Sequence, residues 1–182
     1  MLFRSLAQNS RGLIALSACL QGEVAANLLA NDYAAARQAA SEYRDLFGRD
    51  NFFLEIQDQG LELEHRIQPD LLRLVADTGI PLVATNDCHY LAPEDAQAHD
   101  VLLCIQTGKT VSDTNRMKFG SDQFYFKTAE EMLRVFAAVP EAVTRTVEIA
   151  ERCQVKLGKV EHPFPFFAVR SEERRVGKEC RL

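Results

Sequence analysis

The sequence predicts an α/β protein in which parallel strands are covered by helices. Strand-like and helix-like segments alternate along the chain, and the strand-like segments are continuous apolar runs, as in strands buried on both faces. The chain has 182 residues and is 47% hydrophobic, which is enough for one domain with a substantial core.

Three short apolar runs predict the strands. They are GLIALSA at residues 12–18, NFFLEIQ at residues 51–57 and PLVATN at residues 81–86. Between the first two, residues 21–48 are rich in alanine and leucine and predict two helices, which are separated near Asn31-Asp32.

The helix between the second and third strands is predicted from its end signals. Pro69 suits the first position of a helix, Gly79 suits the position after the last turn, and Pro81 prevents the helix from continuing. The predicted apolar stripe of this helix consists of Leu71, Leu72, Val75 and Ala76.

Three helices and one short strand are predicted after residue 86. The helices are expected at residues 93–108, 128–136 and 140–152, and the strand at residues 123–127. Acids follow Pro93 in the first turn, where the helix dipole favours them, and Thr128 forms a capping box with Glu131. Val143, Val147 and Ala150 are expected on one apolar face of the last helix.

Composition excludes several classes of protein. No apolar run approaches membrane-spanning length, and no signal peptide is visible at the start. The five cysteines form no CxxC pair and no regular framework, which predicts a reducing, cytoplasmic compartment.

Both ends of the chain resemble translated sequencing-adaptor DNA. If residues 170–173 are encoded as AGA TCG GAA GAG, the reverse complement CTC TTC CGA TCT translates as Leu-Phe-Arg-Ser, which is the sequence of residues 2–5. We therefore expect residues 1–5 and 170–182 to be foreign flanks on a fragment of a longer protein, with a natural basic tail as the alternative.

The expected flanks change the charge of the natural part. They carry six basic and three acidic residues, so removing their net +3 from the formal net charge of −5 leaves −8. Such an acidic segment has no electrostatic footprint for a phosphate backbone, so direct nucleic-acid binding by this segment alone is not indicated.

Chemically versatile side chains follow all three predicted strands. Because the carboxyl ends of parallel strands meet at one edge of a sheet, these residues are expected to converge there. They are Ser17-Ala18-Cys19, Gln57-Asp58-Gln59 and Asn86-Asp87-Cys88-His89.

The triplet Asp87-Cys88-His89 is the strongest candidate for a metal site. Cysteine, histidine and aspartate are ligands for zinc and similar ions, and the extended period of two places Asp87 and His89 on the same side. Cys88 then faces away, and Cys19 could join from the neighbouring strand end. Spacing alone leaves open a capped turn with a half-buried cysteine, or a Cys19–His89 nucleophile pair.

Other candidates are weaker. Asp58 follows a strand, where an acid is often only solvated, and His99 lies on a helix within one turn of leucines, which favours packing over ligation. His65 is expected to be solvated in a polar loop. Cys104 and Cys153 are expected on apolar helical faces as small hydrophobic residues.

Five blocks of the sequence resemble one known family, in order, from about Gly12 to Cys153. They resemble the PHP (polymerase and histidinol phosphatase) domain of the bacterial DNA polymerase III alpha subunit. The blocks are GLIALSACLQGEVA, FFLEIQDQG, PLVATNDCHYLAPEDAQAHDVLLCIQTG, FYFKTAEEM and TVEIAERC.

The resemblance implies a fold and a ligand set. The fold would be part of a distorted (β/α) barrel, with residues 6–108 as the C-terminal part of the PHP domain. Residues 109–169 would end that domain and lead through short helices toward the polymerase region. Cys19 would match a late cysteine ligand, and Asp87 with His89 the final Asp-x-His pair of a divalent-metal site, with zinc or manganese expected.

The same resemblance implies the function of a longer parent protein. That parent would be a magnesium-dependent DNA polymerase acting on DNA and deoxynucleotides, with a proofreading subunit and a sliding clamp as partners. The PHP site would hydrolyse phosphodiesters as a 3′–5′ proofreading nuclease. The other metal ligands, mainly histidines, would lie earlier in the domain, so weak metal binding by this segment alone is expected. A non-catalytic scaffold and a free-standing phosphoesterase are the alternatives.

Overall fold

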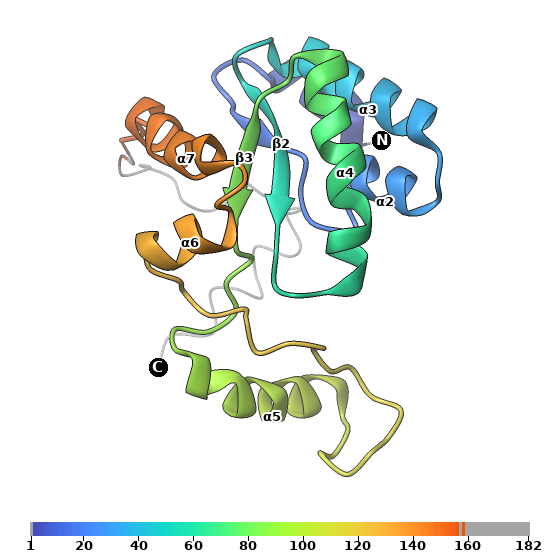
Figure 1. Cartoon of the computed structure of the whole chain (residues 1–182), viewed down its shortest axis with the longest axis vertical. Coiled ribbons are helices and arrows are strands. Elements are labelled where there is room, and N and C mark those ends of the chain that lie inside the picture. The colour runs from blue at the N-terminus through green and yellow to red at the C-terminus, as the bar shows by residue number, and fades with distance from the viewer. Residues whose placement is uncertain (1, 157, 159–182) are drawn as a thin grey trace, which may run out of the picture. The chain divides into compact units, whose positions relative to one another are not determined.

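The computed structural model describes residues 2–156 and 158, and its helices and strands all lie in the unit formed by residues 1–152. The described residues contain one three-stranded parallel sheet with the order β1-β2-β3, made of β1 (Ala15–Leu16), β2 (Phe52–Gln57) and β3 (Leu82–Thr85) (Figure 1). The predicted α/β class with parallel strands and covering helices is confirmed.

The first strand is shorter than predicted. Only Ala15 and Leu16 pair with β2, opposite Phe52 and Phe53. The predicted run ends early because Ala18 adopts a left-handed conformation with φ of 65°, which turns the chain out of the extended path.

Two helices connect β1 to β2, as predicted. They are α2 (Glu23–Leu29) and α3 (Tyr33–Phe47). The break falls where the sequence places it, because Asn31 has a φ of 60° and the Asp32 carboxylate accepts a 2.9 Å hydrogen bond from the Ala35 amide at the start of α3.

The predicted start of the next helix is wrong. α4 (Glu62–Thr78) begins seven residues before Pro69, which lies inside it. Its first turn is held by the buried Glu64 carboxylate, which accepts hydrogen bonds from the Gln59 and Leu61 amides at 2.7 Å and 3.1 Å. These contacts form an N-terminal cap well before the proline, so Pro69 marks no boundary.

The apolar stripe of α4 also differs from the prediction. Ile67, Leu71 and Leu74 are buried at a helical spacing, whereas Leu72 is 42% exposed and Ala76 is exposed. The helix ends at Gly79 in the left-handed region, as predicted.

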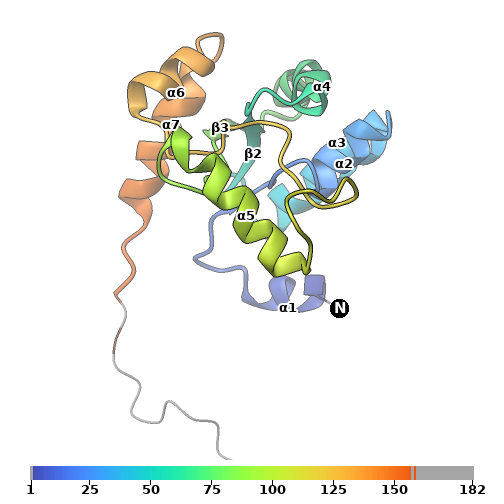
Figure 2. The same ribbon diagram turned by 90° about the horizontal axis from the view of Figure 1, so that it is seen from below.

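Most of the core lies between the sheet and α2, α3 and α4, and Phe136 and Ala142 extend it toward the C-terminal helices. Phe52, Leu54 and Ile56 of β2 alternate with residues of the opposite face and pack with the helices. Leu54 and Leu74 are fully buried, and each such burial contributes about 2 kcal/mol. Helices α2–α4 lie on one side of β2 and β3, and α6 and α7 lie on the other (Figure 1, Figure 2).

The C-terminal helices α6 (Ala129–Val135) and α7 (Pro140–Arg152) match their predicted positions, and Thr128 caps α6. The predicted apolar face of α7 is correct only for Val143. Ala142 is buried and Val143 is partly buried, whereas Val147 is 59% exposed and Ala150 is exposed.

The predicted helix at residues 93–108 forms as a 3₁₀ turn η1 (Pro93–Asp95) followed by α5 (Ala96–Thr107). The helix α5 lies beyond the carboxyl ends of β2 and β3 in Figure 1 and passes in front of these strands when they are seen from below in Figure 2. Residues 123–127 form no strand and contribute only a bridge between Tyr125 and Tyr90. A side chain takes the place of a neighbouring strand here. The Asn86 side-chain amide donates hydrogen bonds to the carbonyls of Gln123 and Tyr125, which would otherwise bind the backbone of a second strand.

The assignment of both chain ends to translated adaptor DNA stays a prediction. Helix α1 (Leu2–Asn9) includes residues 2–5, which were assigned to a foreign flank. Residues 170–182 lie outside the described residues. In the part of the chain that the structure describes, no helix is both long enough and apolar enough to cross a membrane.

Candidate functional site

The carboxyl end of β1 turns tightly and places Cys19 beside the sheet. The Gly22 amide donates a 2.8 Å hydrogen bond to the Cys19 carbonyl. A Cβ atom on Gly22 would lie 2.2 Å from the Ser17 carbonyl oxygen, so this turn requires glycine. The half-buried Cys19 shares a small hollow with Glu55 and Gln57 of β2.

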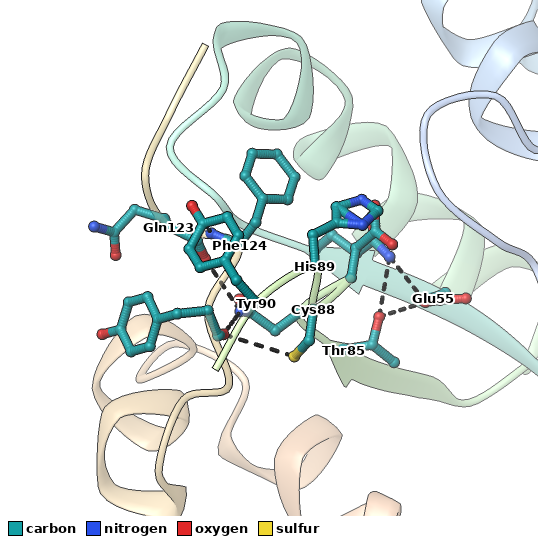
Figure 3. A network of polar contacts seen from close by, with 11 residues as sticks. Glu55, Thr85, Cys88, His89, Tyr90, Gln123 and Phe124 are labelled. Atoms are coloured by element: carbon teal, nitrogen blue, oxygen red, sulfur yellow. Dashed lines mark hydrogen bonds and ion pairs between the residues drawn. The ribbon is translucent and has the colours of Figure 1, made fainter. Parts of the chain in front are cut away.

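A polar network joins β2 to β3 just below their ends. The Gln57 side-chain amide donates hydrogen bonds to Glu55 Oε1 at 3.0 Å and to Thr85 Oγ1 at 3.1 Å. The Thr85 hydroxyl in turn donates a hydrogen bond to Glu55 Oε1 (Figure 3). The Glu55 backbone amide donates a 2.8 Å hydrogen bond to Ser17 Oγ, which connects the end of β1 to this network. The three strand ends are therefore linked through side chains.

Asp87 and His89 lie next to each other at the end of β3. His89 Nε2 is 3.6 Å from Asp87 Oδ2, and their side chains are 35% and 40% exposed. β3 ends at Thr85 and Asp87 has a φ of 44°, so a left-handed turn brings the pair together rather than the extended period used in the sequence argument. Cys88 points to the other side, with Sγ 3.6 Å from the Tyr125 carbonyl (Figure 3).

Residues 123–127 hold this turn in place. The His89 amide donates a 2.8 Å hydrogen bond to the Phe124 carbonyl, and the Asn86 side-chain amide donates to the Tyr125 carbonyl at 2.6 Å. Lys127 Nζ donates to Asn86 Oδ1 at 3.0 Å and also to the Gln123 carbonyl. We call these contacts between residues 86–90 and 123–127 the turn clamp.

Lys127 is the least expected part of the turn clamp, because a lysine is rarely this deeply buried. Lys127 is only 8% exposed, and its ammonium lies 4.4 Å from the centre of the Tyr125 ring. Burial lowers the pKa of Lys127. Its hydrogen bonds to neutral oxygens and the ring contact offset part of the cost of burying the charge.

The weaker candidates have partners of their own. Asp58 Oδ1 lies 3.0 Å from His65 Nε2 and also accepts a 3.0 Å hydrogen bond from the Gly60 amide. His65 lies in the first turn of α4, so its predicted place in a loop is wrong. His99 stacks on His89 with ring centres 5.5 Å apart, and burial together with His89 lowers the pKa of His99.

The two remaining cysteines behave differently from each other. Cys104 is 3% exposed on α5, as predicted for a small hydrophobic residue. Cys153 is exposed and follows the end of α7 at Arg152, so its predicted place on an apolar helical face is wrong.

Residues 3–59 match the PHP domain family. A DNA polymerase III subunit alpha from Treponema pallidum (strain Nichols) is 46% identical over 167 residues, which are 92% of this chain and 14% of that protein. The chain is a homologue of the PHP part of DNA polymerase III alpha subunits. The subunits alpha from Saccharopolyspora erythraea and Helicobacter pylori (strain ATCC 700392 / 26695) are 43% and 40% identical over 82% and 84% of the chain.

The family relationship confirms the resemblance drawn from the sequence blocks, and the three parallel strands are consistent with part of a PHP-type barrel. The chain spans only 13% or 14% of the length of these relatives. The segment that contains the candidate site therefore matches only a small part of each of these much longer proteins.

The donor atoms of Asp87 and His89 fit two ligands of one metal ion. Metal–ligand bonds of about 2.1 Å at a tetrahedral angle place neighbouring donors about 3.4 Å apart, close to the observed 3.6 Å. Within residues 2–156 and 158, no group of three or more histidine, cysteine or acidic side chains is placed to hold a metal ion. The spacing of the pair is compatible with two ligands of one ion, and the assignment of Asp87, His89 and Cys19 as metal ligands stays a prediction.

Sequence reasoning missed two residues near the pair, namely Lys127 and Phe119, and it placed Asn86 at the strand end without predicting its contacts. Asn86 and Lys127 form the turn clamp, and Phe119 lies edge-on to His89 at 4.7 Å between ring centres. The signal available for Lys127 was its position in QFYFK, where a lysine ends an aromatic run. No local pattern marks Phe119 or the contacts of Asn86, because these contacts join segments that are distant in the sequence.

Proposed function

We propose that this chain is the C-terminal part of the PHP domain of a bacterial DNA polymerase III alpha subunit and contributes ligands to a phosphodiesterase site. The observation that supports this most strongly is the Asp87–His89 pair, 3.6 Å apart at the carboxyl end of a parallel strand. Cys19 is the proposed third ligand from the neighbouring strand end, and the remaining ligands would come from the preceding part of the parent protein.

In this proposal Asp87 and His89 hold a divalent ion, with zinc or manganese as the candidates. A bound ion would supply an activated water and would neutralise charge that develops on the phosphate. The turn clamp keeps Asp87 and His89 in a left-handed turn that would otherwise be free to open. The network of Glu55, Gln57 and Thr85 fixes the strand ends beneath the pair.

The whole protein would be a DNA-directed DNA polymerase. It would use magnesium, a primed DNA strand and deoxynucleotides, and would work in the cytoplasm with a proofreading subunit and a sliding clamp. Residues 6–108 would end the barrel, and residues 109–169 would complete the domain and lead to the polymerase region. The PHP site itself would remove nucleotides in the 3′–5′ direction.

Two alternatives belong to different classes. A non-catalytic PHP scaffold would stabilise the polymerase or dock a proofreading subunit, and a free-standing PHP enzyme would hydrolyse small phosphates. High identity to polymerase subunits continues over 92% of the chain, which favours the polymerase parent over a free-standing enzyme.

The deciding experiment combines Asp87→Asn with His89→Ala in the full-length subunit. Exonuclease activity on a labelled primer should fall at least about 100-fold while primer extension stays unchanged, because two metal ligands are lost far from the polymerase site. Asp45→Asn is the matched control, since this acid of α3 is 71% exposed and remote from the strand ends.

Unchanged exonuclease activity in the double variant would overturn the catalytic proposal and support the scaffold. Loss of both activities together with a lower melting temperature would also point to a structural role. Hydrolysis of p-nitrophenyl phosphate without any primer extension would identify the free-standing enzyme.

A further inference from the structure

A hollow of about 610 Å³ lies between the start of α5 and residues 118–122. Its aromatic walls are Tyr90, His99 and Phe119, and Leu103 adds an apolar side chain. The volume lies in the range typical of small-molecule sites, and polar and charged side chains line the hollow together with the rings.

The hollow is separated from the candidate metal ligand His89 by the ring of His99. The His99 ring, which lines the hollow, stacks on the His89 ring with 5.5 Å between centres and an interplanar angle of 13°. Phe119 lies edge-on to both rings, at 4.7 Å from His89 and 4.9 Å from His99. A ligand in the hollow would therefore be adjacent to a phosphate held at Asp87 and His89.

The charges around the hollow favour an uncharged ligand. Asp100 is engaged by Arg116 through two hydrogen bonds of 2.6 Å and 2.8 Å. Lys118 and Asp122 carry opposite charges at the rim. The other polar side chains there, Gln97 and Ser121, are neutral and can donate and accept hydrogen bonds.

We propose that this hollow is a subsite for a nucleobase, whose attached phosphodiester lies at Asp87 and His89. A nucleobase is flat, uncharged and rich in hydrogen-bonding groups, which matches walls made of aromatic rings and neutral polar side chains. Free phosphate does not match, because the hollow has no net cluster of cations. The inference rests on the proposed function, since that function supplies the phosphodiester.

The aromatic cluster also holds α5 in place, so a purely structural role must be separated from ligand binding. Gln97 and Gln38 are both exposed glutamines on helices, but only Gln97 lines the hollow. Gln97→Trp should fill the hollow without disturbing buried side chains, and Gln38→Trp on α3 is the matched control. Phe119→Leu keeps an apolar side chain but removes the ring, and Phe126→Leu, at a 69% exposed position, is its control.

The test compares a probe that has a base with one that lacks it. Saturation-transfer NMR on the full-length subunit in EDTA measures binding of thymidine 5′-monophosphate and of deoxyribose 5-phosphate. Because base–aromatic stacking strengthens binding by about tenfold or more, the wild type should prefer the base-carrying probe at least tenfold. Gln97→Trp and Phe119→Leu should abolish this preference, and both controls should retain it.

Absence of the preference in the wild type, or its survival in Gln97→Trp, would overturn the nucleobase subsite. The outcome is independent of the metal because EDTA is present. If the preference is absent while Asp87→Asn with His89→Ala still abolishes exonuclease activity, only the subsite proposal fails. If the preference is present while that double variant keeps its exonuclease activity, the hollow binds a base and the proposed catalytic function fails.

Discussion

Two parts of this protein are stabilised in different ways. The sheet body, formed by β1–β3 with α2–α4, α6 and α7, shares one buried apolar core. The α5 arm, residues 86–127, contributes no residue to that core among the described residues. Its contacts are the turn clamp, the rings around Phe119 and the ion pair of Asp100 with Arg116.

The comparison shows that the sheet body supplies the rigid strands, whereas the α5 arm carries the candidate metal ligands Asp87 and His89. Apolar burial holds the strands in place, and polar contacts then fix the strand ends and the turn that carries Asp87 and His89. Neutral hydrogen bonds contribute about 1 kcal/mol each on a net basis, about half the contribution of a buried leucine. The α5 arm should therefore open locally while the sheet body stays folded.

The largest effect is expected in the sheet body. Leu74→Ala should lower the free energy of unfolding by about 3 kcal/mol, because Leu74 is fully buried and the change leaves a cavity. Leu72→Ala is the control on the same helix, and its 42% exposure predicts a change below about 1 kcal/mol. Denaturant unfolding measures both. An equally large effect of Leu103→Ala on global unfolding would contradict the division between body and arm.

The next effect is expected in the turn clamp. Lys127→Met removes the hydrogen bonds to Asn86 and Gln123, so the turn should open about 10–100 times more often. Hydrogen exchange of the His89 amide, which binds the Phe124 carbonyl, reports this opening. Lys109→Met is the matched control at an exposed lysine outside the turn clamp. An unchanged exchange rate at His89 would show that Lys127 does not hold the turn.

A smaller effect concerns the pH dependence of the sheet body. Burial raises the pKa of Glu64 above its ordinary value of 4.5, so the folded chain keeps a proton that the unfolded chain has released. The free energy of unfolding should therefore decline as pH rises from 4.5 through the raised pKa. Glu64→Gln should remove this decline, as measured by denaturant unfolding across that range. The same decline in Glu64→Gln as in the wild type would exclude Glu64 as its source, and Glu62→Gln on the same turn is the control.

The smallest effect has the opposite sign and lies in the α5 arm. The hydrogen bonds from Arg116 hold the pKa of Asp100 below its ordinary value of 3.8. The pair therefore contributes stability above that pH, and the contribution is lost as pH falls through the lowered pKa. Arg116→Gln should remove this acid sensitivity from hydrogen exchange of α5 amides, while Arg44→Gln should not. Acid sensitivity that survives in Arg116→Gln would assign it to another group.

The sequence predicts elements whose end signals are local. Asp32 caps α3, Thr128 caps α6 and Pro140 begins α7, and each signal acts within one helical turn. The start of α4 was misplaced because its cap depends on Glu64 reaching back to a preceding loop, while Pro69 is accommodated inside the helix. The strand predicted at residues 123–127 does not form, because the Asn86 side chain, which is distant in the sequence, donates hydrogen bonds to the carbonyls of Gln123 and Tyr125.

The same distinction applies to the candidate site. Asp87 and His89 are two residues apart, so their proximity could be expected from the sequence alone. The stacking of His99 on His89 and the contacts of Phe119 join segments that are 10 to 30 residues apart, and no local pattern specifies them. The place of Cys19 relative to the pair depends on the pairing of β1 and β3 with the strand β2 between them, which joins segments distant in the sequence.

The separation of the two halves of the turn clamp also affects the order of events during synthesis. Asn86 and Lys127 are 41 residues apart, so a ribosome adding about 5–20 residues per second completes the second half about 2–8 seconds after the first. During that interval β3 can join the emerging sheet while the turn after it has no fixed shape. The strands β1–β3 and the helices α2–α4 are thus synthesised before the turn clamp can close, whereas α6 and α7 follow it, and a translational pause between residues 90 and 123 would prolong the interval in which the turn is not fixed.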